Sequence, residues 1–102
     1  MTILLYLLAA LLIALNVADW RTTRAAILSG RGREANPVMA FLIARFGLDR
    51  ALIGKGVCVA AFGVWIAASA AKTAPYDALA TLLVINAIYV WVIRNNLRAL
   101  NP

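Results

Sequence analysis

Several polar side chains stand inside segments that are otherwise almost wholly apolar. Asn16, Asp19 and Thr23 are spaced i, i+3 and i+7, so a helix places them on one face. Lys55 lies about one turn into another apolar run. Ionisable groups inside a membrane-spanning segment are rare and mark sites for ions, ligands or lipid headgroups. These residues are therefore the first candidates for a functional site.

Further polar residues extend this cluster along the chain. Glu34 and Asn36 come just before Pro37, and Asn86 and Asn96 share one face of the last apolar run. If three apolar runs cross a bilayer, Asn86 lies near mid-membrane, and the following residues lie toward the same leaflet: Asp19, Glu34, Asn36, Lys55 and Asn96. The candidate polar cluster is Asn16, Asp19, Thr23, Glu34, Asn36, Lys55, Asn86 and Asn96.

Residues typical of soluble active sites are scarce. The chain has no His and a single Cys, Cys58, which lies in an apolar run. It therefore lacks the commonest general base and the commonest metal ligand. No glycine-rich phosphate loop and no Cys-x-x-Cys pair is present. We expect no catalytic residue, no metal, no cofactor and no enzymatic activity.

The composition is that of a membrane protein. Of 102 residues, 65% are hydrophobic and 14% are charged, and the mean hydropathy is +0.88. Soluble domains are about half apolar and about a quarter charged. The formal charge of +6 sits between and beside the apolar blocks, so it favours orientation in a bilayer over binding of nucleic acid.

The apolar blocks predict the fold. We expect an all-α integral membrane protein with three transmembrane helices plus a short re-entrant or interfacial half-helix. The block that follows Pro37 has roughly 10 residues, about 15 Å of helix, against a hydrocarbon core of about 30 Å. The predicted elements of this single domain, residues 1–102, are helix 1–29, loop 30–36, half-helix 37–47, helix 50–72 and helix 76–100.

The first apolar run could also be a signal peptide. A signal peptide needs a basic start and a cleavage site of small residues. Here Thr2 leads directly into Ile3, and the segment from Asn16 to Ala18 is a poor cleavage site. We therefore interpret the run as a retained transmembrane helix.

Basic residues predict the orientation. With three spans, one side of the membrane holds Lys72 and the other holds Arg21, Arg24, Arg31, Arg33, Arg45, Arg50, Arg94 and Arg98. With four spans this asymmetry nearly vanishes. The positive-inside rule then favours three spans, with the N-terminus outside and the C-terminus in the cytoplasm. The expected location is the cytoplasmic (inner) membrane of a bacterium or archaeon.

Each polar residue also has a structural interpretation. Lys55 can extend its ammonium group to the headgroups. Asp19 and Glu34 can form ion pairs with nearby arginines, and Asn86 can join two helices by a hydrogen bond. We nevertheless predict that Lys55 is paired inside the protein, with Asp19 or Glu34 as its counter-ion. A helical stripe of small residues predicts close approach of another helix: Gly56, Ala60, Gly63 and Ala67.

These motifs resemble a known family. The pattern Asn16-x-x-Asp19-x-x-x-Thr23, the pattern Gly30-x-x-x-Glu34-x-Asn36-Pro37, Lys55 at the start of the next span and Asn95 or Asn96 at the end of the last are similar to a prokaryotic family of small membrane proteins catalogued as a domain of unknown function. The resemblance covers most of the chain. It implies a compact multi-helix membrane unit and supplies no reaction.

Three hypotheses for function follow. The first is a non-enzymatic module of a membrane complex or homo-oligomer, since three short helices bury little surface alone. The second is binding of a small anion, ion or lipid headgroup at the polar cluster, toward the cytoplasmic leaflet. The third is a holin-like pore former, although the chain lacks a long charged tail. The expected partners are the lipid bilayer and further membrane protein subunits.

Overall fold

Four helices make up the part of the chain that the computed structural model describes, residues 1–30 and 37–101. They are α1 (Thr2–Leu28), α2 (Pro37–Phe46), α3 (Leu48–Ala70) and α4 (Pro75–Leu100). Helices α1, α3 and α4 are long and apolar enough to cross a membrane, and α2, with 10 residues, is too short. The predicted fold class is therefore confirmed, and the protein is a multi-pass membrane protein.

Glycines set two of the helix ends. Gly30, with φ at +75°, follows the end of α1, where the predicted loop 30–36 begins. Gly47, with φ at +96°, is the single residue between α2 and α3. Glycine adopts these positive φ values without a steric penalty. Because one residue makes the connection, α3 begins at Leu48 and not at residue 50. The helix ends at Ala70, two residues before the predicted end.

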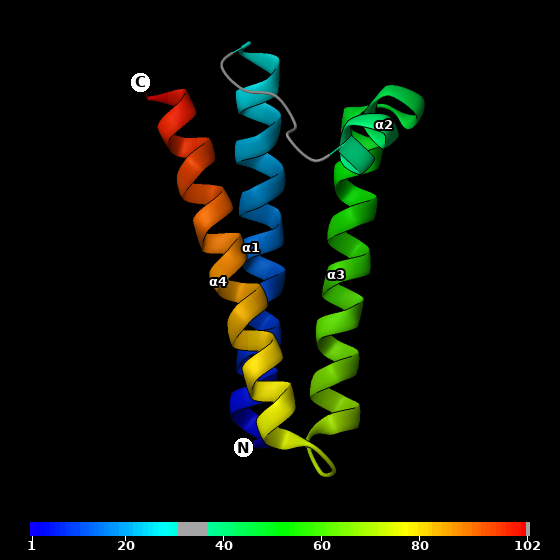
Figure 1. Cartoon of the computed structure of the whole chain (residues 1–102), viewed down its shortest axis with the longest axis vertical. Helices are drawn as coiled ribbons and strands as arrows, with labels where there is room; N and C mark the ends of the chain where they lie inside the picture. Colours follow the sequence, from blue (N-terminus) through cyan, green and yellow to red (C-terminus); the bar gives the residue numbers. More distant parts are fainter. Residues whose placement is uncertain (31–36, 102) are drawn as a thin grey trace.

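Helix α1 is the centre of the bundle. It contacts both α3 and α4, whereas α3 and α4 contact each other much less. In Figure 1, α3 lies near α4 at the turn that joins these two helices, and it separates from α4 toward the opposite end of the bundle. The buried residues of α1 alternate by four and three positions, which is one continuous helical stripe: Leu5, Ala9, Leu12, Asn16, Asp19, Thr23 and Ala26.

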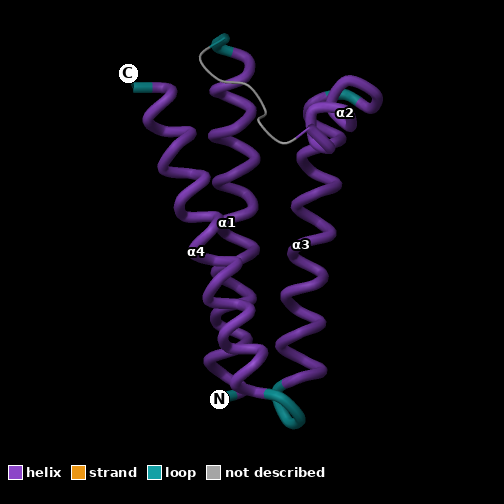
Figure 2. The backbone as a smooth tube through the Cα atoms, viewed as in Figure 1, coloured by secondary structure: helices purple, strands orange, loops and turns teal. Residues whose placement is uncertain are grey.

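Two apolar clusters hold the helices at opposite ends. The larger one joins the three long helices near the α3–α4 turn, with Leu5, Leu12, Ala67 and Leu82 fully buried or nearly so. The smaller one packs α2 against the first turns of α3. It contains Met39, Ala51 and Leu52, with Trp20 of α1 beside them. Helix α2 thus folds back on α3 at the end of the bundle away from Met1 (Figure 2).

Candidate functional site

A partly buried ion pair joins α1 to α3. The Nζ atom of Lys55 lies 2.8 Å from Oδ2 of Asp19. The side chain of Asp19 is 3% exposed and that of Lys55 is 29% exposed. The ammonium group also stands 5.8 Å from the centre of the Tyr89 ring on α4, within the range of a cation–π contact. The predicted pairing of Lys55 is confirmed, and Asp19 is the counter-ion.

Hydroxyl and amide groups extend the pair to α4. Thr23 donates a hydrogen bond to Oδ1 of Asp19 at 3.1 Å. Asn96 in turn donates from Nδ2 to the hydroxyl oxygens of Thr23 at 2.8 Å and Thr22 at 3.0 Å. Both carboxylate oxygens of Asp19 therefore have a donor, and one connected network ties all three spanning helices together.

This network compensates the charge of the Asp19 carboxylate, which lipid could not do. An unpaired carboxylate is costly in a low-dielectric environment, and its cost falls when a cation and a hydroxyl both serve it. The interior stripe of α1 positions Asp19 and Thr23 one turn apart, toward Lys55 and Asn96. The arrangement fixes the relative positions of the three helices, and Lys55 remains partly accessible from outside the bundle.

Two other members of the candidate cluster lie apart from this network. Asn86 donates from Nδ2 to the carbonyl oxygens of Leu8 and Leu82, which joins α4 to α1 nearer the N-terminal end of α1. Asn16 donates to the carbonyl oxygen of Leu12 in its own helix. The Oδ1 atoms of Asn16 and Asn86 are buried and have no hydrogen-bond partner among the described residues. The predicted positions Glu34 and Asn36 lie outside the described residues.

The stripe of small residues divides into two halves. Gly63 and Ala67 are buried, and a Cβ atom on Gly63 would come within 2.7 Å of a methyl group of Leu12. Close helix approach, as the sequence predicted, therefore occurs at Gly63. Gly56 and Ala60 instead line an open groove, and a Cβ on Gly56 would find only Asn16 nearby, at 3.7 Å from Oδ1.

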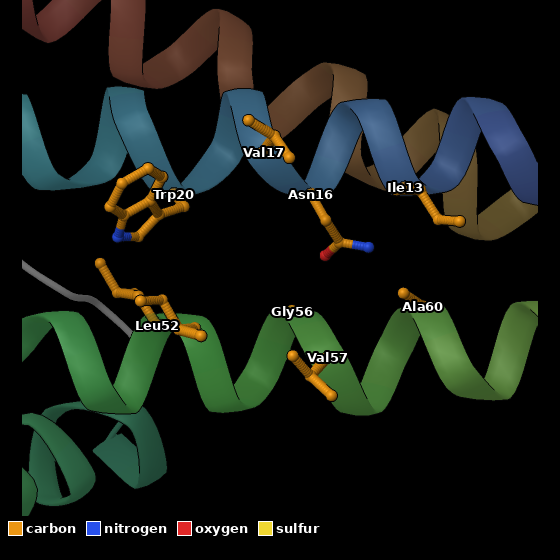
Figure 3. A pocket seen from close by; sticks show the side chains of 9 residues that line it. Ile13, Asn16, Val17, Trp20, Leu52, Gly56, Val57 and Ala60 are labelled. Atoms are coloured by element: carbon orange, nitrogen blue, oxygen red, sulfur yellow. The ribbon is translucent and has the colours of Figure 1, made fainter.

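This groove lies between α1 and α3 and has a volume of about 210 Å³. Its walls are almost wholly apolar, and the carboxamide of Asn16 projects between the two helices from α1 (Figure 3). The lining residues are Ile13, Asn16, Val17, Trp20, Leu52, Ile53, Gly56, Val57 and Ala60. We call it the α1–α3 groove.

A second groove, of about 460 Å³, lies between α2 and α3. Met39, Leu42 and Phe46 supply one wall from α2, and Arg50 and Lys55 lie on the α3 side. Two positive side chains therefore border an apolar hollow at the end of α3 against which α2 packs. We call it the α2–α3 groove.

Sequence reasoning missed one polar contact between helices. Asp49, in the first turn of α3, accepts hydrogen bonds from Nε of Arg24 at 2.9 Å and from the indole of Trp20 at 3.4 Å. Both charged side chains are about half exposed, so this ion pair contributes little to stability. An acidic residue in a first helical turn was the available signal, but it does not specify Arg24 as the partner.

Comparison with known proteins points to one family. Residues 10–101 match the family model described as a domain of unknown function, DUF5658. The match includes α2 to α4 and most of α1. No curated protein and no solved structure matches the chain.

Proposed function

The chain belongs to the DUF5658 family, and from this premise we propose that it acts as a non-enzymatic assembly module of a membrane complex or homo-oligomer. One observation carries the proposal. The three spanning helices form an open arrangement, in which α1 contacts both neighbours while α3 and α4 contact each other little. A further helix can pack along the open α1–α3 groove.

The chemistry of the interior supports the same proposal. The charge of Lys55 is compensated by Asp19, and the carboxylate is further served by Thr23. These groups bond to each other across helices, so they stabilise a scaffold. Association of membrane helices depends on packing at small residues and on interhelical hydrogen bonds. Gly56 and Ala60 provide such a small-residue surface in the α1–α3 groove.

We also propose the orientation in the cytoplasmic (inner) membrane of a bacterium or archaeon. Arginines of α1, α2, α3 and α4 gather at the end of the bundle away from Met1, and Lys72 lies in the turn at the other end. By the positive-inside rule, the arginine-rich end faces the cytoplasm and the end with Met1 faces outward.

Co-purification of two differently tagged copies tests the assembly role. Both copies are expressed together, extracted in a mild detergent and purified through one tag. We expect recovery of the second tagged copy, or of another membrane protein in a fixed ratio. Recovery of the first copy alone, under conditions in which it stays folded, would contradict the proposal.

A second candidate function is binding of an anionic lipid headgroup at the polar cluster. The favouring observation is that Arg50 and the partly exposed Lys55 border the apolar α2–α3 groove. Binding to vesicles with and without anionic lipid tests it. Arg50→Gln should weaken a preference for anionic vesicles. Arg98→Gln serves as the control, because Arg98 lies on α4 and does not line this groove. The absence of any headgroup preference would rule this candidate out.

A further inference from the structure

The acceptor at the base of the α1–α3 groove lacks a donor. Asn16 is 8% exposed, and its Oδ1 atom is buried without a hydrogen-bond partner among the described residues. The carboxamide projects into the groove between the two helices (Figure 3). Buried acceptors in proteins are satisfied by protein groups or ordered water in the great majority of cases. The occupant of this groove should therefore combine an apolar body with one N–H or O–H donor.

The outer face of α4 carries such a group. Trp91 is 64% exposed, and its indole has no hydrogen-bond partner among the described residues. Tyr89, two positions earlier, is buried in the core cluster. Two residues correspond to about 200° around a helix, so Trp91 points away from the buried side of α4. Tryptophan offers a large apolar ring with a single N–H, which usually finds an acceptor when buried.

Trp91 and Asn16 lie at the same level along the bundle. Asn86 contacts Leu8, and Asn96 contacts Thr23, so these pairs fix the register of α4 along α1. Trp91 is midway between the two asparagines, and Asn16 is close to midway between Leu8 and Thr23. Rotation about the membrane normal relates copies in a bilayer without changing depth. A second copy can therefore bring its Trp91 to the level of Asn16.

We propose that the α1–α3 groove receives the outer face of α4 from a second copy of the chain. The carboxamide of Asn16 then turns toward the groove, so that its Oδ1 accepts a hydrogen bond from the indole of Trp91. This inference rests on the proposed assembly function and names its contact. The ring packs between the apolar walls, beside the small residues Gly56 and Ala60. The contact uses two different surfaces, so it is heterologous and produces a ring or an open row of copies.

A lipid chain is the competing occupant. It would fill the apolar groove, but a hydrocarbon chain has no donor for Oδ1 of Asn16. Trp91 would then serve only as an aromatic anchor at the membrane interface. An interfacial anchor does not depend on residue 16, so coupling between the two positions separates the explanations.

The first experiment measures the dissociation constant of the oligomer in micelles by energy transfer between labelled copies. Trp91→Phe keeps an aromatic ring and removes the N–H, and Asn16→Leu removes the acceptor. Each should weaken association by about 3- to 30-fold, the range measured for interhelical hydrogen bonds in membranes. The double variant should associate no more weakly than the single variant with the weaker association. Trp65→Phe, at an equally exposed position on α3, should have no effect.

The second experiment remains informative if Asn16→Leu fails to fold. Chains with Trp91→Cys are mixed with chains carrying Val57→Cys, both in a Cys58→Ala background, and oxidised in lipid. We expect a disulfide-linked dimer from the mixture and none from either chain alone.

The contact would be overturned, with the oligomer itself intact, if Trp91→Phe left association unchanged and no cross-link formed. A lipid retained by the wild type and lost when Gly56→Leu fills the groove, seen in native mass spectrometry, would also overturn it. A wild-type protein that is monomeric throughout would overturn the assembly function itself.

Discussion

Removing one partner of the Lys55–Asp19 pair should destabilise the bundle, and by unequal amounts for the two partners. Lys55→Met leaves the carboxylate of Asp19 in a site where its side chain is 3% exposed, with Thr23 as its remaining donor. Removing one partner of a buried ion pair costs about 3–5 kcal/mol. Asp19→Asn leaves Lys55, whose side chain is 29% exposed and can extend to the headgroups. Asp19→Asn should therefore cost less, about 1.5–3 kcal/mol, which is the contribution of one hydrogen bond to a charged group.

A double-mutant cycle measures the coupling. Unfolding of each variant in mixed micelles is followed by circular dichroism as the fraction of denaturing detergent is raised. The double variant Lys55→Met with Asp19→Asn has no unpaired charge, so it should be more stable than the sum of the single effects by about 1–3 kcal/mol.

The exposed pair of Arg24 and Asp49 provides the control. Its side chains are 45% and 51% exposed, so the cycle of Arg24→Gln and Asp49→Asn should show a coupling of about 0–1 kcal/mol. Strict additivity at Lys55 and Asp19, or a coupling no larger than that of the exposed pair, would refute the reasoning. Lys55 would then extend to the headgroups, and its pairing with Asp19 would contribute nothing to the free energy of unfolding.

Three further predictions concern packing, topology and the α1–α4 contact. Gly63→Leu should lower thermal stability strongly because a Cβ there already meets Leu12, whereas Gly54→Leu should be tolerated because nothing lies within 4 Å; equal effects of the two in a thermal melt would contradict the packing. In a Cys58→Ala background, Arg50→Cys should react with an impermeant thiol reagent from the cytoplasm and Thr73→Cys from outside, and labelling of both from one side would refute the topology. Asn96→Leu should cost about 1–3 kcal/mol, because it removes two hydrogen bonds to α1; an unchanged free energy of unfolding would show that the bonds contribute nothing.

Hydropathy and helix length were sufficient to predict the spans and the short helix. The sequence also placed Asp19 and Lys55 within reach of each other, because Asp19 stands where the first apolar run ends and Lys55 about one turn inside another run on the same side of the membrane. It left Glu34 as an alternative counter-ion. The spacing of Asn16, Asp19 and Thr23 correctly indicated a shared face, which is buried against the neighbouring helices.

The sequence did not specify which helix lies in the centre. All three spans are similarly apolar, so hydropathy does not rank them, and packing of side chains decides the arrangement. For the same reason the stripe on α3 appeared uniform, although Gly63 is buried against Leu12 while Gly56 and Ala60 line an open groove. The missing donors for the Oδ1 atoms of Asn16 and Asn86 are also properties of the packed helices, since the residue type alone does not predict them.

The mass of the protein extracted from its membrane together with the surrounding lipid, in polymer-bounded discs without detergent, tests the assembly function most directly. One chain has a mass of 11.0 kDa. We predict particles that contain a fixed multiple of this mass, or one chain together with a second membrane protein in constant ratio. Particles that contain a single 11.0 kDa chain and no other protein, at the natural level of expression, would contradict it.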